Sequence, residues 1–81
     1  MATEPHDEHA LDLRALPPPL PMLRAMDVAR ALAPGASAVV LTPMWPLPLF
    51  ASLEEQGLRW DARHLPCGGA RVQIRRPDGA D

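Results

Sequence analysis

Residues 11–23 read LDLRALPPPLPML, and this stretch decides the fold. Its first four residues alternate between apolar and charged, which is typical of a strand with one buried face. The prolines at 17–21 suit a turn followed by the first turn of a helix, because proline lacks only an N–H that has no intrahelical partner there. We therefore expect a strand over residues 10–14, a rigid proline turn, and a helix over residues 19–32.

Four more elements are expected after this helix. The apolar run at 37–42 lacks alternation and predicts a central strand. Residues 46–56 have helical spacing, and Gly57 suits the position just after a helix C-terminus. Residues 58–64 and 70–76 alternate again and predict two strands joined by a glycine-containing turn.

These segments predict an α+β two-layer sandwich in the order β-α-β-α-β-β, with a four-stranded mixed sheet and two helices on one face. The inward helix positions should be Leu23, Met26, Ala29, Leu32, Leu49, Phe50 and Leu53. The covered sheet face should carry Leu11, Leu13, Trp60, Val72 and Ile74, with Trp60 buried. The opposite face should carry Asp12, Arg14, Arg59, Asp61, Arg63, Arg71, Gln73 and Arg75.

Length and composition indicate one small domain. The 81 residues allow a single domain, which we place at 10–76 between disordered tails at 1–9 and 77–81. The acidic, polar start does not look like a signal peptide, and no apolar run is long enough for a membrane span, so we expect a cytoplasmic protein without a membrane partner. Residues 11–76 carry eight arginines against five acidic residues, between two acidic tails, and this mildly basic body is too weakly charged for a dedicated nucleic-acid binder, which usually has a pI above about 9.

The order of the motifs resembles a known superfamily. A Leu-Asp pair at 11–12 precedes Leu16 and the frame Pro19-x-Pro21, and a Pro-Gly turn, an apolar strand, a second helix and a final hairpin follow. This arrangement resembles the TusA/SirA-like superfamily, whose sulfur carriers place a Cys-Pro-x-Pro motif at the start of the first helix. In those sulfur carriers, the cysteine of the motif passes a persulfide to a partner protein. Here Pro18 stands at the cysteine position.

Within that superfamily, the chain is most similar to an uncharacterised bacterial branch known only as a domain of unknown function. The similarity spans residues 10–76. It rests on the stretch 11–18, Pro34-Gly35, Pro46-x-Pro48-Leu49-Phe50 and Val72-x-Ile74-Arg75.

The function we expect is a non-enzymatic accessory domain that binds a protein partner, with no catalytic residue, metal or cofactor. Three consecutive prolines form a pre-ordered edge that costs little entropy to bind. A Met-Trp pair in a proline-rich loop suits the rim of a binding surface, or equally a cap folded over the sheet. The arginine-lined sheet face suits an acidic partner, or a solvated face with cross-strand Arg–Asp pairs. The expected partner-binding residues are Pro18, Pro19, Pro21, Met44, Trp45, Arg14, Arg59 and Arg71.

Two alternatives stay open. The chain could be a sulfur carrier that uses Cys67, its one cysteine, although no base is positioned beside it by sequence spacing. It could instead be a ligand or metal module, acting through His6 and His9 or through the Trp45 loop.

Overall fold

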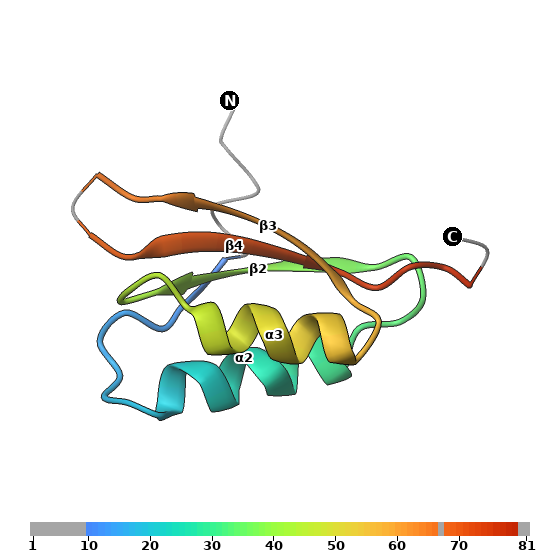
Figure 1. Cartoon of the computed structure of the whole chain (residues 1–81), viewed down its shortest axis with the longest axis horizontal. Coiled ribbons are helices and arrows are strands. Elements are labelled where there is room, and N and C mark those ends of the chain that lie inside the picture. The colour runs from blue at the N-terminus through green and yellow to red at the C-terminus, as the bar shows by residue number, and fades with distance from the viewer. Residues whose placement is uncertain (1–9, 67, 80–81) are drawn as a thin grey trace.

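Six elements form a helix layer packed on a sheet layer, as Figure 1 shows. The computed structural model describes residues 10–66 and 68–79. The elements are β1 (Leu11–Asp12), α2 (Leu20–Arg30), β2 (Ser37–Thr42), α3 (Leu47–Glu55), β3 (Arg59–His64) and β4 (Ala70–Arg75). The expected order and the two-layer sandwich are therefore confirmed, whereas the expected tail at 1–9, Cys67 and the last two residues lie outside the described part.

The sheet has the strand order β1-β2-β4-β3. β2 is central, as predicted, because it pairs in parallel with β1 and antiparallel with β4, which in turn pairs with β3. β1 is shorter than the strand expected over 10–14. The N–H of Leu13 still donates a 2.8 Å hydrogen bond to the carbonyl oxygen of Leu41 in β2, and the chain leaves the sheet after it, where the Asp12 carboxylate accepts a 3.0 Å hydrogen bond from the backbone N–H of Arg14.

The core lies between the helices and the sheet. α3 buries Leu49, Phe50 and Leu53, as predicted, and its C-terminus closes on Gly57 at φ +76°. α2 differs from the prediction, because Leu23 is 53% exposed. Its buried face includes Ala25 and Ala29, both fully buried, since small side chains let this helix lie close to the sheet.

Trp60 is on the expected face but is only half-buried, so its predicted full burial is wrong. Its ring stacks on Phe50 with the ring centroids 3.7 Å apart and 4° between the planes. Its indole Nε1 donates a 3.0 Å hydrogen bond to the Glu54 carboxylate. β3 is an edge strand, so α3 covers one face of the ring and leaves the polar edge accessible. Leu11, on the other edge strand, is likewise exposed rather than covered.

Candidate functional site

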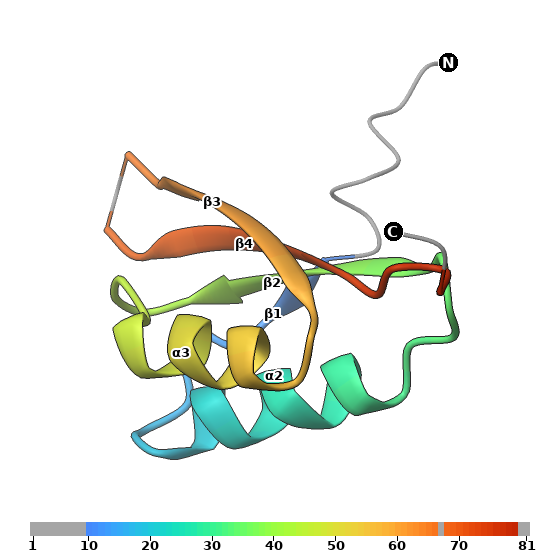
Figure 2. The ribbon, with the colours of Figure 1, turned by 45° about the vertical axis from the view of Figure 1, so that its right-hand side comes forward.

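The two helices begin side by side at one end of the molecule. In Figures 1 and 2, α2 and α3 run in the same direction, so their N-terminal ends lie on the same side. Pro19 precedes α2 and Pro46 precedes α3, and each helix carries a further proline in its first turn, Pro21 and Pro48. The fixed φ angle of proline matches the first turn of a helix, so the prolines in the sequence determine where both helices begin.

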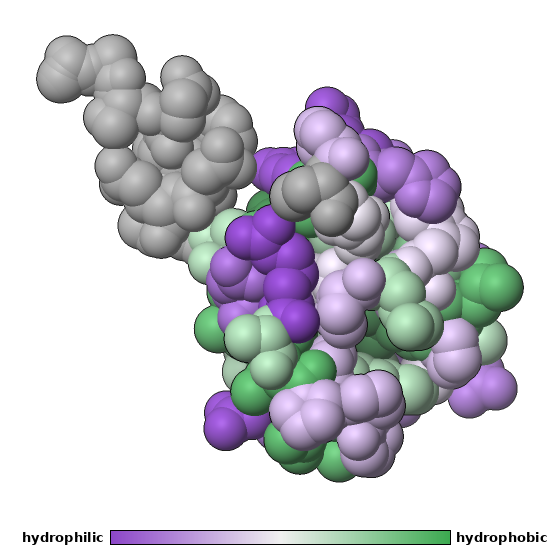
Figure 3. Space-filling model, turned by 90° about the vertical axis from the view of Figure 1, so that its left-hand side faces the viewer, coloured by the Kyte–Doolittle hydropathy of each residue, from purple (hydrophilic) through white to green (hydrophobic). Residues whose placement is uncertain are grey.

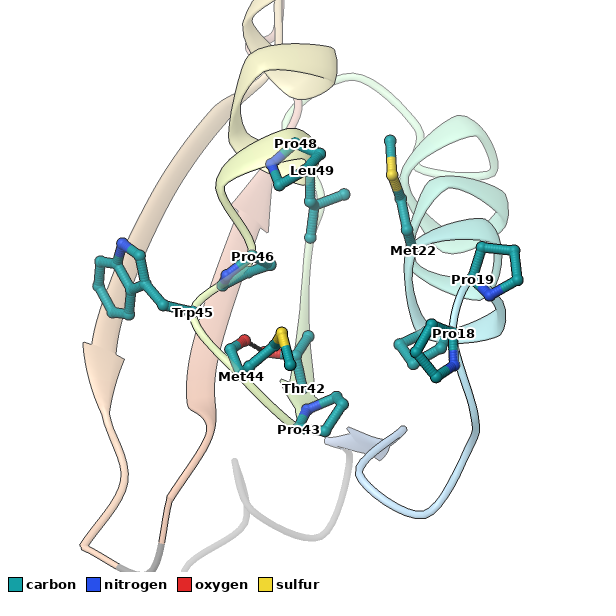
Figure 4. A pocket seen from close by; sticks show the side chains of 11 residues that line it. Pro18, Pro19, Met22, Thr42, Pro43, Met44, Trp45, Pro46, Pro48 and Leu49 are labelled. Carbon is teal, nitrogen blue, oxygen red and sulfur yellow. Dashed lines mark hydrogen bonds between the residues drawn. The ribbon is translucent and has the colours of Figure 1, made fainter.

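A groove of about 250 Å³ lies between these two helix starts (Figure 4). It is lined by Pro18, Pro19, Pro21, Met22, Thr42, Pro43, Met44, Trp45, Pro46, Pro48 and Leu49. No lining residue is charged, and the single hydroxyl, that of Thr42, donates a 2.8 Å hydrogen bond to the carbonyl oxygen of Met44. Figure 3 views this end of the molecule, where apolar and weakly hydrophilic residues occupy the centre. The site is therefore an apolar surface that suits packing.

The structure brings together five of the eight residues expected to bind a partner. Pro18, Pro19 and Pro21 line one side of the groove, and Met44 and Trp45 line the other. The remaining lining residues were not predicted from the sequence as part of a binding site. The proline-rich stretch at 43–48, which mirrors the one at 17–21, is the signal that could have identified them.

Met44 and Trp45 differ in how they are held. Trp45 is half-buried: its ring stacks on His64 with the centroids 4.1 Å apart and meets Phe50 edge-on at 5.3 Å. It therefore folds back as a cap, on the side of the groove away from α2 (Figure 4). Met44 is 65% exposed and forms the rim. The interpretation as a cap therefore describes Trp45, whereas Met44 lies at the rim of the groove.

The β3–β4 turn packs closely against the loop that carries Met44. Gly69 has φ +88°, and a Cβ atom built on it would clash with the carbonyl oxygen of Thr42. A side chain there would push the loop and the turn apart. Gly69 therefore sets the position of this wall of the groove.

Arg14, Arg59 and Arg71 do not line the groove. Arg14 binds the Asp12 carboxylate at 2.8 Å, and its hydrogen bonds lower the pKa of Asp12 to about 2. Arg59 and Arg71 lie on the sheet face away from the helices, where cross-strand Arg–Asp pairs were expected. That expectation is wrong for the directly opposed positions, because the register places arginine opposite arginine.

Three further candidates are outside the residues that the structure describes. Residues 10–66 and 68–79 contain no group of three side chains suited to a metal ion, while His6, His9 and Cys67 fall outside these ranges. Within the same ranges, neither helix is long and apolar enough to cross a membrane.

Comparisons with known proteins bear on the family and on the fold. A family model described as "Uncharacterized conserved protein (DUF2249)" matches residues 10–76. No curated protein matches the chain. Among solved structures, a SirA-like protein from Desulfitobacterium hafniense is similar with a TM-score of 0.73 and 21% sequence identity, covering 84% of this chain and 96% of that one. The architecture is therefore a SirA-like fold.

Proposed function

The chain belongs to the family of uncharacterized conserved proteins called DUF2249, and from this starting point we propose that it is a non-enzymatic interaction domain that binds a protein partner. The partner would insert an apolar side chain into the groove between the starts of α2 and α3. One observation carries the proposal: two proline-rich segments far apart in the sequence line a single apolar groove.

The size of the groove favours a protein over a small molecule. Pockets for small molecules and cofactors usually measure about 300–1,000 Å³. The groove, at about 250 Å³, is smaller and has room for one or two apolar side chains. Buried anchors of this kind carry most of the binding energy of protein interfaces.

The lining combines stiff and adaptable residues. Prolines on both sides keep the groove's shape before binding, which lowers the entropy lost when a partner docks. Met22 and Met44 have flexible, polarizable side chains that can adjust to an anchor of irregular shape. The groove is thus suited to binding an exposed side chain of another protein.

The chemistry of the lining supports a non-enzymatic role. Its one hydroxyl, on Thr42, is buried and already donates to the Met44 carbonyl oxygen. Pro18, which offers no nucleophile, occupies the place where sulfur carriers of the resembling superfamily have cysteine.

A matched pair of variants tests the groove. Met44 and Leu47 are near in sequence and 65% and 64% exposed, but only Met44 lines the groove. We expect a displayed library of random peptides, selected on the wild-type domain, to yield peptides that share an apolar anchor. These peptides should also bind Leu47→Asp and should lose binding to Met44→Asp. Peptides that bind both variants equally, or a selection that yields none, would contradict the proposal.

A further inference from the structure

Two of the methionines of the chain line the groove, and solvent reaches them to different extents. Met44 lies at the rim and is 65% exposed. Met22 is half-buried on the opposite side of the groove, as Figure 4 shows. Met26 of α2 does not line the groove and is only 5% exposed. Among the described methionines, Met44 is therefore the one that a dissolved reagent reaches first.

The groove offers few hydrogen-bond donors to an oxidised methionine. Six of the eleven lining residues are prolines, which have no backbone N–H. The hydroxyl of Thr42 already donates to the carbonyl oxygen of Met44, and the ring of Trp45 points away from the groove (Figure 4). A sulfoxide oxygen is a hydrogen-bond acceptor, so at Met44 it would be satisfied by water at the open rim but not beneath a docked partner.

We propose that Met44 is a redox modification site, at which oxidation to methionine sulfoxide by a peroxide switches off binding in the groove. This inference rests on the proposed function of the groove. In the reaction, the Met44 sulfur attacks one oxygen of hydrogen peroxide with an electron pair. An S–O bond forms, the O–O bond breaks, and the second oxygen takes up the proton of the first and leaves as water. A flexible apolar side chain thereby becomes a polar one.

The exposure of Met44 makes this a change in binding and not in folding. Its thioether lies mostly in solvent in the free domain, so the sulfoxide stays hydrated and the core keeps its packing. Docking removes that water, and a polar group that is buried without a hydrogen bond weakens an interface. Oxidation of the buried Met26 would instead disturb the core.

The modification at Met44 is also accessible to repair. A methionine sulfoxide reductase removes the oxygen as water, while two thiols of the reductant become a disulfide. The position at the rim leaves the side chain open to such an enzyme. The domain would thus release its partner under peroxide and bind it again after reduction.

The test moves the thioether out of the groove. Leu47 is 64% exposed, nearly as much as Met44, but it does not line the groove. The double variant Met44→Leu/Leu47→Met therefore carries an equally exposed methionine outside it. Both proteins are treated with hydrogen peroxide until peptide mass spectrometry shows an added oxygen at position 44 or 47 and none at Met26. Circular dichroism checks that the treated proteins are folded.

The readout is the affinity for peptides selected on the wild-type groove, measured on each protein before and after treatment. In the wild type, we expect oxidation to weaken binding by about tenfold or more, and methionine sulfoxide reductase with dithiothreitol to restore it. In the double variant, the affinity should stay within about twofold of that variant's own value before treatment.

Three outcomes would overturn the modification site and leave the groove standing. They are an equal loss of affinity in the two proteins, no loss in the wild type once Met44 is oxidised, and oxidation of Met26 as fast as that of Met44. Peptides that bind the untreated wild type would still support the groove in each case. A selection that yields no peptide would instead overturn the groove proposal, and this inference with it.

Discussion

Arg76 caps the end of α2 by donating a 2.7 Å hydrogen bond from its Nε to the carbonyl oxygen of Leu32. Its Nη2 also donates to the carbonyl oxygen of Ala29, at 3.2 Å. The last carbonyl groups of a helix lack intrahelical partners and carry partial negative charge, so a guanidinium is favourable there. A residue just beyond β4 thereby fixes a helix that lies 44 positions earlier in the sequence.

Replacing Arg76 should destabilise the domain. Arg76→Met removes both hydrogen bonds from a half-buried site, and we expect it to lower the free energy of unfolding by about 1–3 kcal/mol. Urea denaturation followed by circular dichroism measures the change. Arg24→Met, at an exposed position on α2, should have little effect, and an equal loss in the two variants would contradict the capping role.

Trp60→Ala should cost less than the loss of a fully buried tryptophan. The ring keeps one exposed side but stacks on Phe50, so we expect a loss of about 2–3 kcal/mol in unfolding free energy. Trp60→Phe retains the stack and should restore most of the stability. If the two variants were equally unstable in urea, the stacking contact would not be the source of the loss.

Gly69→Ala should be more damaging than Gly68→Ala. Both glycines have positive φ, at +88° and +103°, so both substitutions carry backbone strain of about 1–2 kcal/mol. Only at position 69 would the new Cβ also clash with the carbonyl oxygen of Thr42. We expect a larger loss of stability for Gly69→Ala, and shifts of the Thr42 and Met44 amide signals in NMR spectra. Similar spectra for the two variants would show that the turn does not position the groove.

Asp12 should titrate at unusually low pH. The side-chain hydrogen bonds from Arg14 lower its pKa from 3.8 to about 2. The stability that this carboxylate contributes is therefore complete above about pH 3.8 and is lost as the pH falls through about 2. Carboxyl-carbon NMR on wild type and on Arg14→Gln measures the difference, and the variant should raise the pKa toward its ordinary value. An unchanged midpoint would exclude the side chain of Arg14 as the cause.

The domain should not relay sulfur. Incubation with a cysteine desulfurase and cysteine should give no transferable persulfide by mass spectrometry, because Pro18 has no thiol. Cys67→Ser should leave binding of groove-selected peptides intact. A persulfide on Cys67 that passes to an acceptor protein would support the sulfur-carrier alternative instead.

The features predicted well from sequence are local ones. The buried face of α3 and its end at Gly57 follow from spacing within about ten residues, as does the alternation of β3 and β4. Proline chemistry also placed both helix starts. Such features depend on neighbours in the chain, so the sequence shows them directly.

The features that could not be predicted from the sequence depend on contacts between segments far apart in the chain. The groove exists because α2 and α3 start side by side, and the cap by Arg76 needs a partner 44 residues away. The opposed arginines of β3 and β4 depend on strand register, which alternation alone does not reveal. Leu23 was wrongly predicted to face inward. Helical spacing alone does not show that the alanines of α2, and not this leucine, face the sheet.

The charged alternation of β3 has a consequence for solubility. β3 and the two-residue β1 are the edges of the sheet, and exposed edge strands invite pairing with strands of other molecules. A very short strand at one edge and Arg59, Asp61 and Arg63 at the other both discourage such aggregation. A neutral, β-branched replacement such as Arg63→Val would therefore promote aggregation at high protein concentration, whereas a reversal to glutamate keeps this edge charged.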